Sequence, residues 1–164
     1  MIDRIDLNIL EALYEDARTP PARIAQMMNL PVDAINERIA ELERRKVIAG
    51  YPAMINWSAA DQETVEALIE VRISPQRGEG FDAIAEQIYN FDEVHSCFLT
   101  SGAYDLTVLV RGRSVKEVGL FVSEKLSTLE HVLSTATHFV LKRYKDDGII
   151  LEGTRRDYRM AVSP

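Results

Sequence analysis

Residues 17–51 carry the pattern that most restricts the fold, because they read as two short helices joined by a three-residue turn. Thr19 can cap the first helix, and Pro20 suits its first position, where an amide hydrogen would have no helical partner. Asn29 tolerates the positive φ that ends a helix and turns the chain. The second helix is expected to begin at about Pro31. This arrangement is typical of a DNA-reading helix-turn-helix, with a small helical bundle as the alternative.

Apolar side chains recur at helical spacing through the first fifty residues, which predicts three helices around one small core. Asp3 can cap the first of them. Residues 47–55 change to an extended period, and Pro52 keeps this segment at a sheet edge or outside a sheet. A strand-like arm after a helical head indicates a winged or arm-linked DNA-binding module. The predicted inward-facing residues are Ile5, Ile9, Leu10, Leu13, Ile24, Met27, Met28, Ile35, Ile39 and Leu42.

The net charge of −7 argues against DNA binding, because phosphate contacts supply much of the affinity of a DNA-binding protein. The acidic excess is concentrated in residues 51–140, however, which carry a net charge of −7, whereas residues 1–50 carry −2. We therefore expect weak DNA binding per monomer, strengthened when copies are linked in an oligomer. The candidate DNA-binding residues are Arg18, Arg23, Val32, Asp33, Asn36, Glu37, Arg38 and Arg44.

Two of these candidate groups have competing interpretations. The basic residues 44–46 suit phosphate, but cations at a helix C-terminus are also favoured by the helix dipole. Asp33 and Glu37 repel phosphate, yet a carboxylate can accept a hydrogen bond from cytosine N4 in the major groove. The acidic helix is the best argument for a second hypothesis, a metabolite-binding regulator that does not itself bind DNA.

The second half of the chain follows a different pattern, beginning after polar, aperiodic residues that indicate a linker at 57–64. Apolar residues alternate from Val65 to Ile73, the period of a half-buried strand, and Pro75, Gly78 and Gly80 close this strand. The order β-α-β-β-α-β predicts a ferredoxin-like sheet with two helices on one face. The further elements expected are strands over residues 94–100, 104–110 and 132–144, a turn at 101–103, a helix over 81–90 and a helix capped by Ser114.

Three segments, DRIDLNILEALYEDAR, INERIAELERRKVIAGY and TSGAYDLTVLV, stand here in an order and spacing that resembles the Lrp/AsnC family of bacterial and archaeal transcription regulators. The likeness covers nearly the whole chain and implies an α+β protein. A departure is Pro31, where the family usually has a serine or a similar capping residue. The implied domains are a helix-turn-helix over residues 1–50, an arm and linker over 51–64, a ferredoxin-like effector-binding (RAM) domain over 65–145 and an extension over 146–164.

The resemblance also implies homodimers that assemble into tetramers or octamers and bind an amino acid or similar small metabolite between subunits. A glycine-Asp loop lines the family's pocket, and Ser101, Gly102, Ala103, Tyr104 and Asp105 match it. Gly102 exposes backbone groups and Asp105 can pair with an ammonium, although the two residues also suit a plain hairpin.

Other candidates are weaker. Thr135 and Thr137 lie on one face of the last predicted strand and could offer hydroxyls to the same pocket, but threonines also suit any pleated surface. His95, His131 and His138 are too irregularly spaced for a local metal motif. No catalytic motif appears either, so we expect no enzyme activity, metal or cofactor.

No apolar run approaches the length of a membrane span, and the lone Cys97 agrees with a reducing compartment, so a cytoplasmic protein is expected. The terminal residues 146–164 extend past the minimal sensor fold. Their short apolar runs could add an edge strand or reach a neighbouring subunit, whereas Arg155, Arg156 and Arg159 could touch DNA.

Overall fold

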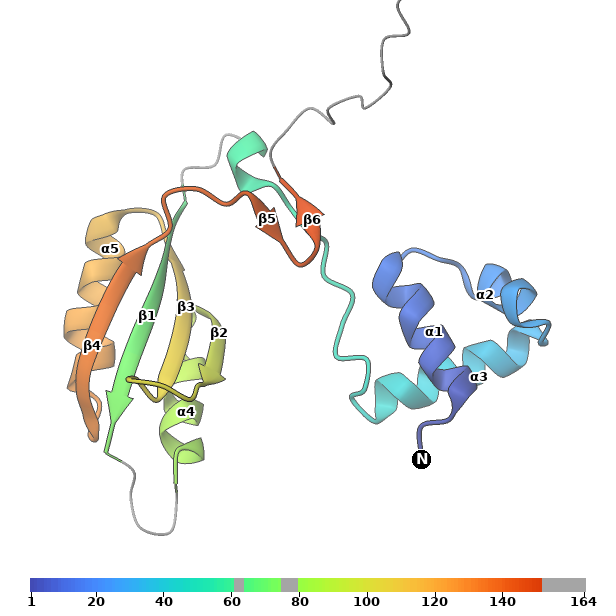
Figure 1. Ribbon diagram of the computed structural model, residues 1–164, viewed down its shortest axis with the longest axis horizontal. Helices are drawn as coiled ribbons and strands as arrows, with labels where there is room; N and C mark the ends of the chain where they lie inside the picture. Colours follow the sequence, from blue (N-terminus) through green and yellow to red (C-terminus); the bar gives the residue numbers. More distant parts are fainter. Residues whose placement is uncertain (61–63, 75–79, 152–164) are drawn as a thin grey trace, which may run out of the picture. The chain divides into compact units, whose positions relative to one another are not determined.

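The structure is a computed structural model that describes residues 1–60, 64–74 and 80–151 (Figure 1). It divides into an N-terminal unit, Met1–Ile55, and a C-terminal unit, Asn56–Pro164. No helix in the described part of the chain combines the length and apolarity that a membrane span needs. The predicted residues Pro75, Gly78, Arg155, Arg156 and Arg159 lie outside the described residues.

The N-terminal unit consists of α1 (Arg4–Glu15), α2 (Pro21–Met28) and α3 (Val32–Arg44). Asp3 caps α1 as predicted, because its side chain accepts from the Asp6 amide while the Asp6 side chain accepts from the Asp3 amide. Asn29 ends α2 in the left-handed conformation, with φ 53° and ψ 46°, which confirms the expected turn. The core consists of Ile9, Ala12, Ile24, Ala25, Ile35 and Leu42.

Two predictions about α2 are wrong. The helix begins at Pro21, so the capping position falls on Pro20 rather than Thr19, and no side chain caps it. The reason is the second proline, because a residue before proline is disfavoured in the α region and Pro20 stays extended. Met27 is 65% exposed, since Ile24, Ala25 and the half-buried Met28 occupy the inward face of this short helix.

The predicted strand-like arm at residues 47–55 is also wrong, because these residues form no strand. Lys46 adopts a φ of 57°, and the amides of Val47 and Ile48 both donate to the carbonyl of Leu42. The chain thereby caps α3 and packs Ile48 against the core. Trp57–Ala60 then forms a single 3-10 turn, η1, in the C-terminal unit.

The C-terminal unit contains the predicted βαββαβ order: β1 (Val65–Ile73), α4 (Asp82–Tyr89), β2 (Val94–Leu99), β3 (Leu106–Gly112), α5 (Val115–Leu120) and β4 (Val132–Phe139). The antiparallel sheet has the strand order β2-β3-β1-β4 (Figure 1). Ile69 and Val108 stand opposite each other and pack with Ile88 of α4 and Phe121, which follows α5. Both helices therefore cover one face of the sheet, as expected for a ferredoxin-like fold.

Some element boundaries differ from the predictions. β3 begins at Leu106 instead of residue 104, because the Thr100 amide donates to the Asp105 carbonyl and closes a wider loop. β4 ends at Phe139 instead of residue 144. Beyond it, β5 (Lys145–Asp146) and β6 (Ile149–Ile150) pair only with each other in a separate hairpin, so the described part of the extension adds no edge strand to the main sheet.

Candidate DNA-reading helix and effector loop

The outward face of α3 is polar and exposed. Ile35 and Leu42 anchor the opposite face in the core, while Val32, Asp33, Asn36 and Glu37 point to solvent in the first two turns. Ala40 continues this stripe one turn later and is exposed too, and sequence reasoning missed it. Its helical position relative to Ile35 and Leu42 was a signal that could have found it.

Arg38 differs from the other candidate DNA ligands because it faces α1. Its Nη1 donates to Asp3 Oδ2 at 2.8 Å and to the buried Asp6 at Oδ1 at 2.7 Å. These two carboxylates raise the pKa of Arg38, and the Asp6 amide together with Arg38 lowers the pKa of Asp3. The guanidinium thus connects α3 to the start of α1.

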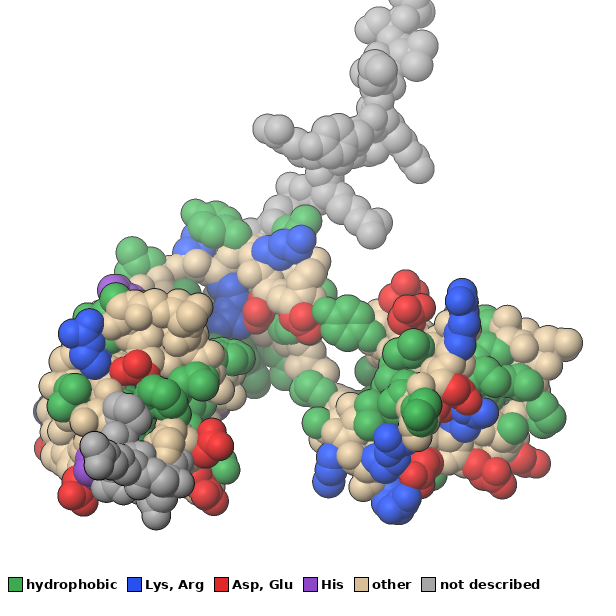
Figure 2. Space-filling model, turned by 60° about the horizontal axis from the view of Figure 1, so that its bottom comes forward, with side chains coloured by type: hydrophobic (Ala, Val, Ile, Leu, Met, Phe, Trp, Pro, Cys, Tyr) green, Lys and Arg blue, Asp and Glu red, His purple; other side chains and the backbone are tan. Residues whose placement is uncertain are grey.

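The remaining candidate arginines fall into two groups. Arg44 bonds Glu41 through two nitrogens, at 2.6 Å for the Nη2 to Oε1 contact, in an exposed pair. Arg18 and Arg23 are exposed before and within α2, and their side chains have no partner among the described residues. On the face of the N-terminal unit that Figure 2 shows, acidic side chains lie among the basic ones.

The candidate effector loop, residues 101–105, is held to the end of β1. Arg72 donates to the carbonyl of Ala103 from Nη2 at 2.7 Å and from Nε at 3.1 Å, and its guanidinium lies 5.7 Å from the centre of the Tyr104 ring. Asp105 accepts from the Ile73 amide at 2.8 Å, and its own amide donates to the carbonyl of Val71. Sequence reasoning missed Arg72, whose alternation with two buried residues of β1 was the available signal.

The structure does not bring Thr135 and Thr137 to this loop within one chain. They pair with Val71 and Ile69, which are buried under the helices, so the two threonines lie half-buried on that same face of the sheet. The candidate effector loop lies at the start of β3, and β1 stands between β3 and β4 in the sheet. Their predicted role therefore needs a second subunit or a ligand that reaches around β1.

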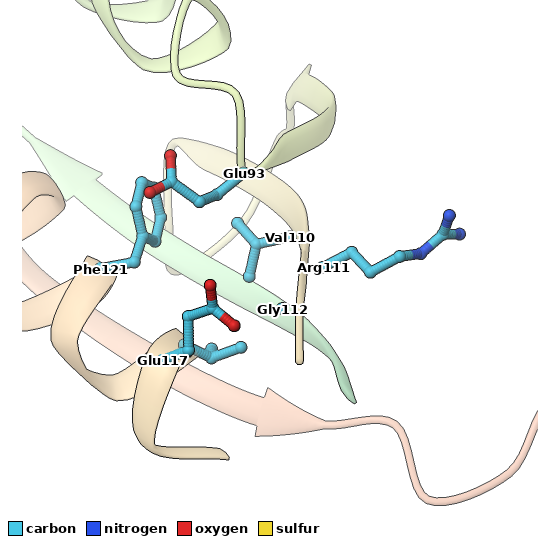
Figure 3. Close-up of a pocket in the computed structure, with 7 residues that line it drawn as sticks. Glu93, Val110, Arg111, Gly112, Glu117 and Phe121 are labelled. Carbon is cyan, nitrogen blue, oxygen red and sulfur yellow. The ribbon is translucent and has the colours of Figure 1, made fainter. Parts of the chain in front are cut away.

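A groove between β3 and α5 is the other feature of this unit (Figure 3). The groove is too narrow to hold a water molecule, with a free volume of about 0 Å³. It is therefore a packing groove and not a ligand cavity. Glu93 reaches Lys125 at 2.5 Å, and this bond lowers the pKa of Glu93. Glu117 accepts from the Arg113 amide at 2.6 Å, which lowers its pKa. No group of three potential metal ligands occurs among the described residues.

Comparison with known proteins identifies the class that this fold and these surfaces define. The AsnC-type helix-turn-helix domain matches residues 2–43, and the Lrp/AsnC ligand binding domain matches residues 66–150. The chain therefore belongs to the Lrp/AsnC family and is a transcriptional regulator with a DNA-binding helix-turn-helix, as the sequence predicted.

Particular relatives agree with this assignment. The HTH-type transcriptional regulator YugG of Bacillus subtilis (strain 168) is 49% identical over 97% of this chain and 96% of its own length. The leucine-responsive regulatory protein of Klebsiella pneumoniae is 29% identical over 94% of this chain and 93% of its own. A transcriptional regulator of Neisseria meningitidis, crystallised in complex with L-Met, has the same fold, with a TM-score of 0.69 and 23% identity over 89% of this chain and 94% of that chain.

Proposed function

We propose that this regulator binds double-stranded DNA with α3 in the major groove and with Arg18 and Arg23 on the flanking phosphates. The observations that carry this proposal are the exposed polar face of α3 and two exposed arginines of the same unit, Arg18 and Arg23, whose side chains have no partner among the described residues. Val32, Asp33, Asn36 and Glu37 supply the base contacts in this arrangement, because they lie on its first two turns. The helix-turn-helix match over residues 2–43 favours this function over a regulator that does not bind DNA.

A gel shift on the DNA upstream of its own gene tests the proposal. Because phosphate contacts release counterions, log affinity should fall linearly with log salt, and Arg18→Ala should make that slope shallower. Arg44→Ala is the matched control, since its guanidinium is already bonded to Glu41. Absence of binding at low salt would contradict the proposal.

We also propose an amino acid or a similar small metabolite as the effector, bound at residues 101–105. The ligand-binding domain match covers this loop, one relative is named as leucine-responsive, and another is a complex with L-Met. The candidate contacts are the backbone around Gly102 and the carboxylate of Asp105. The regulator catalyses no reaction in this proposal, which the names of its relatives as regulators support.

A homodimer that assembles further into tetramers or octamers is the third part of the proposal. The sheet face away from α4 and α5 carries apolar side chains, including Phe98 at 57% and Leu68 at 37% exposed. Such a face is an aggregation liability unless a partner covers it. Light scattering at micromolar concentration should report a dimer or larger, and Leu68→Asp should shrink the particle. A monomeric wild type would contradict this part.

A further inference from the structure

The exposed face of α3 is unusually acidic for a helix that reads DNA. Successive residues of a helix turn by about 100°, which places Asp33, Asn36, Glu37 and Ala40 together on the side opposite Ile35. All four are exposed, and the three polar side chains have no partner among the described residues. This stripe therefore presents two carboxylates, one carboxamide and one methyl group to whatever lies against α3.

Carboxylates accept hydrogen bonds and donate none when ionised. In the major groove guanine offers only the acceptors N7 and O6, so Asp33 and Glu37 have nothing to bond on it. Cytosine N4 and adenine N6 are the donors that a carboxylate can use. Asn36 both donates and accepts, which suits the N6 and N7 edge of adenine, and Ala40 suits the methyl group of thymine.

The arginines of α3 are the groups that would normally read guanine, and both are committed elsewhere. Arg38 is bonded to Asp3, which caps α1, and to Asp6 in the first turn of α1. Arg44 is bonded to Glu41. Using either one on a base would leave its carboxylate partner without a cation, and in the case of Asp6 that carboxylate is buried. Guanine readout by α3 is therefore disfavoured by the structure of the N-terminal unit.

We propose that α3 reads the exocyclic amino groups of cytosine and adenine, through Asp33, Asn36 and Glu37, and does not read the N7 and O6 acceptors of guanine. The inference rests on the proposed DNA binding and specifies its chemistry. Asp33 and Glu37 then act mainly in discrimination, because their charge repels phosphate while their oxygens select among bases. Affinity for random DNA is lowered by the same residues that provide the specificity.

Base analogues give the first test. The full-length protein selects its preferred duplexes from a randomised library at low salt, and the chosen sequence is then resynthesised with single altered bases. N4-methylcytosine or N6-methyladenine at a contacted position should lower affinity roughly 5- to 150-fold, the range for one base contact. Replacing guanine by 7-deazaguanine, which lacks N7, should leave affinity unchanged. A loss of affinity with 7-deazaguanine, or none with the methylated bases, would overturn the proposed readout.

Charge-neutral variants give the second test. Glu37→Gln and Asp33→Asn should bind random DNA more tightly than wild type at low salt, yet prefer the selected duplex less. Glu11→Gln is the matched control, because Glu11 is an exposed residue of α1 and its loss changes the net charge equally. If both α3 variants keep the wild-type preference, the readout assignment is wrong. Failure of the wild type to bind any duplex would instead contradict the proposed DNA binding.

Discussion

Arg38 and Asp6 stand 32 residues apart in the chain, yet Arg38 Nη1 lies 2.7 Å from Asp6 Oδ1. Asp6 is a buried residue of the first turn of α1, where its side chain also accepts from the amide of Asp3. A single guanidinium therefore satisfies a buried carboxylate and joins the first and third helices of the N-terminal unit. This contact gives Arg38 a structural role, whereas the sequence had suggested it as a candidate DNA-binding residue.

We expect Arg38→Ala to destabilise the N-terminal unit by about 1–3 kcal/mol, because it leaves the buried Asp6 carboxylate without its charged partner. Arg44→Ala is the control, since that arginine forms an exposed pair whose loss is worth roughly 0.2–1 kcal/mol. Urea unfolding followed by circular dichroism measures both. Equal effects of the two substitutions would show that Arg38 contributes no more than a surface ion pair.

The carboxylate of Asp3 should make the stability of the fold depend on pH. The Asp6 amide and then Arg38 hold the pKa of Asp3 below its ordinary value. A carboxyl group with a lower pKa in the folded state stabilises the fold above its unfolded pKa, and this stabilisation is lost as pH falls through the folded pKa. The unfolding midpoint should therefore decline below about pH 4. Asp3→Asn keeps a capping oxygen without an ionisable group, so its midpoint should depend less on pH in that range.

The elements that the sequence predicted well depend on local signals. The Asp3 cap, the left-handed Asn29 and the alternation through β1 are set by residues close in the chain, and all three are present. The contacts that it missed join distant segments. Arg72 reaches Ala103 across 31 residues, and Arg38 reaches Asp3 across 35, so neither pairing has a local sequence signature. The predicted start of α2 was wrong for a local reason, because Pro20 and Pro21 are consecutive prolines.

Trp57 offers a measurement of the contacts at the start of the C-terminal unit. It is the single tryptophan of the chain, and the Arg111 guanidinium lies 5.6 Å from the centre of its ring. Arg111 is held by Glu66 at 2.6 Å, and Glu66 also bonds Arg143 in the segment before the C-terminal hairpin. Arg111→Ala should therefore shift the Trp57 fluorescence to longer wavelength. Arg113→Ala, which removes an exposed pair with Glu117, should leave the emission unchanged.

Two glycines near α5 provide a matched pair of substitutions. A methyl group on Gly112 would come within 3.1 Å of Val118 Cγ2, whereas one on Gly119 would meet nothing within 4 Å. We expect Gly112→Ala to destabilise the C-terminal unit by about 1–3 kcal/mol through overpacking. Gly119→Ala should stabilise the C-terminal unit by about 0.5–1 kcal/mol, because glycine loses more backbone entropy than alanine when it folds into a helix. Thermal unfolding that moves in the same direction for both variants would contradict this account of β3 and α5 packing.

The effector loop needs a test that separates ligand binding from folding, because Asp105 already accepts from the Ile73 amide at 2.8 Å. Asp105→Ala removes that bond as well as the charge, so a loss of effector binding would be ambiguous. Asp105→Asn keeps one oxygen that can accept from Ile73, while the negative charge is removed and the second oxygen becomes an amide donor.

If Asp105 pairs with an amino-acid ammonium, the asparagine variant should remain as stable as wild type and bind the effector about 10- to 150-fold more weakly. That range corresponds to roughly 1.5–3 kcal/mol for a hydrogen bond to a charged group. Calorimetry with the twenty amino acids on wild type and variant measures the difference. An amino acid that binds both proteins equally would show that Asp105 only secures the loop against β1. The ammonium would then require another acceptor, and the backbone carbonyl of Gly102 is a candidate on the same loop.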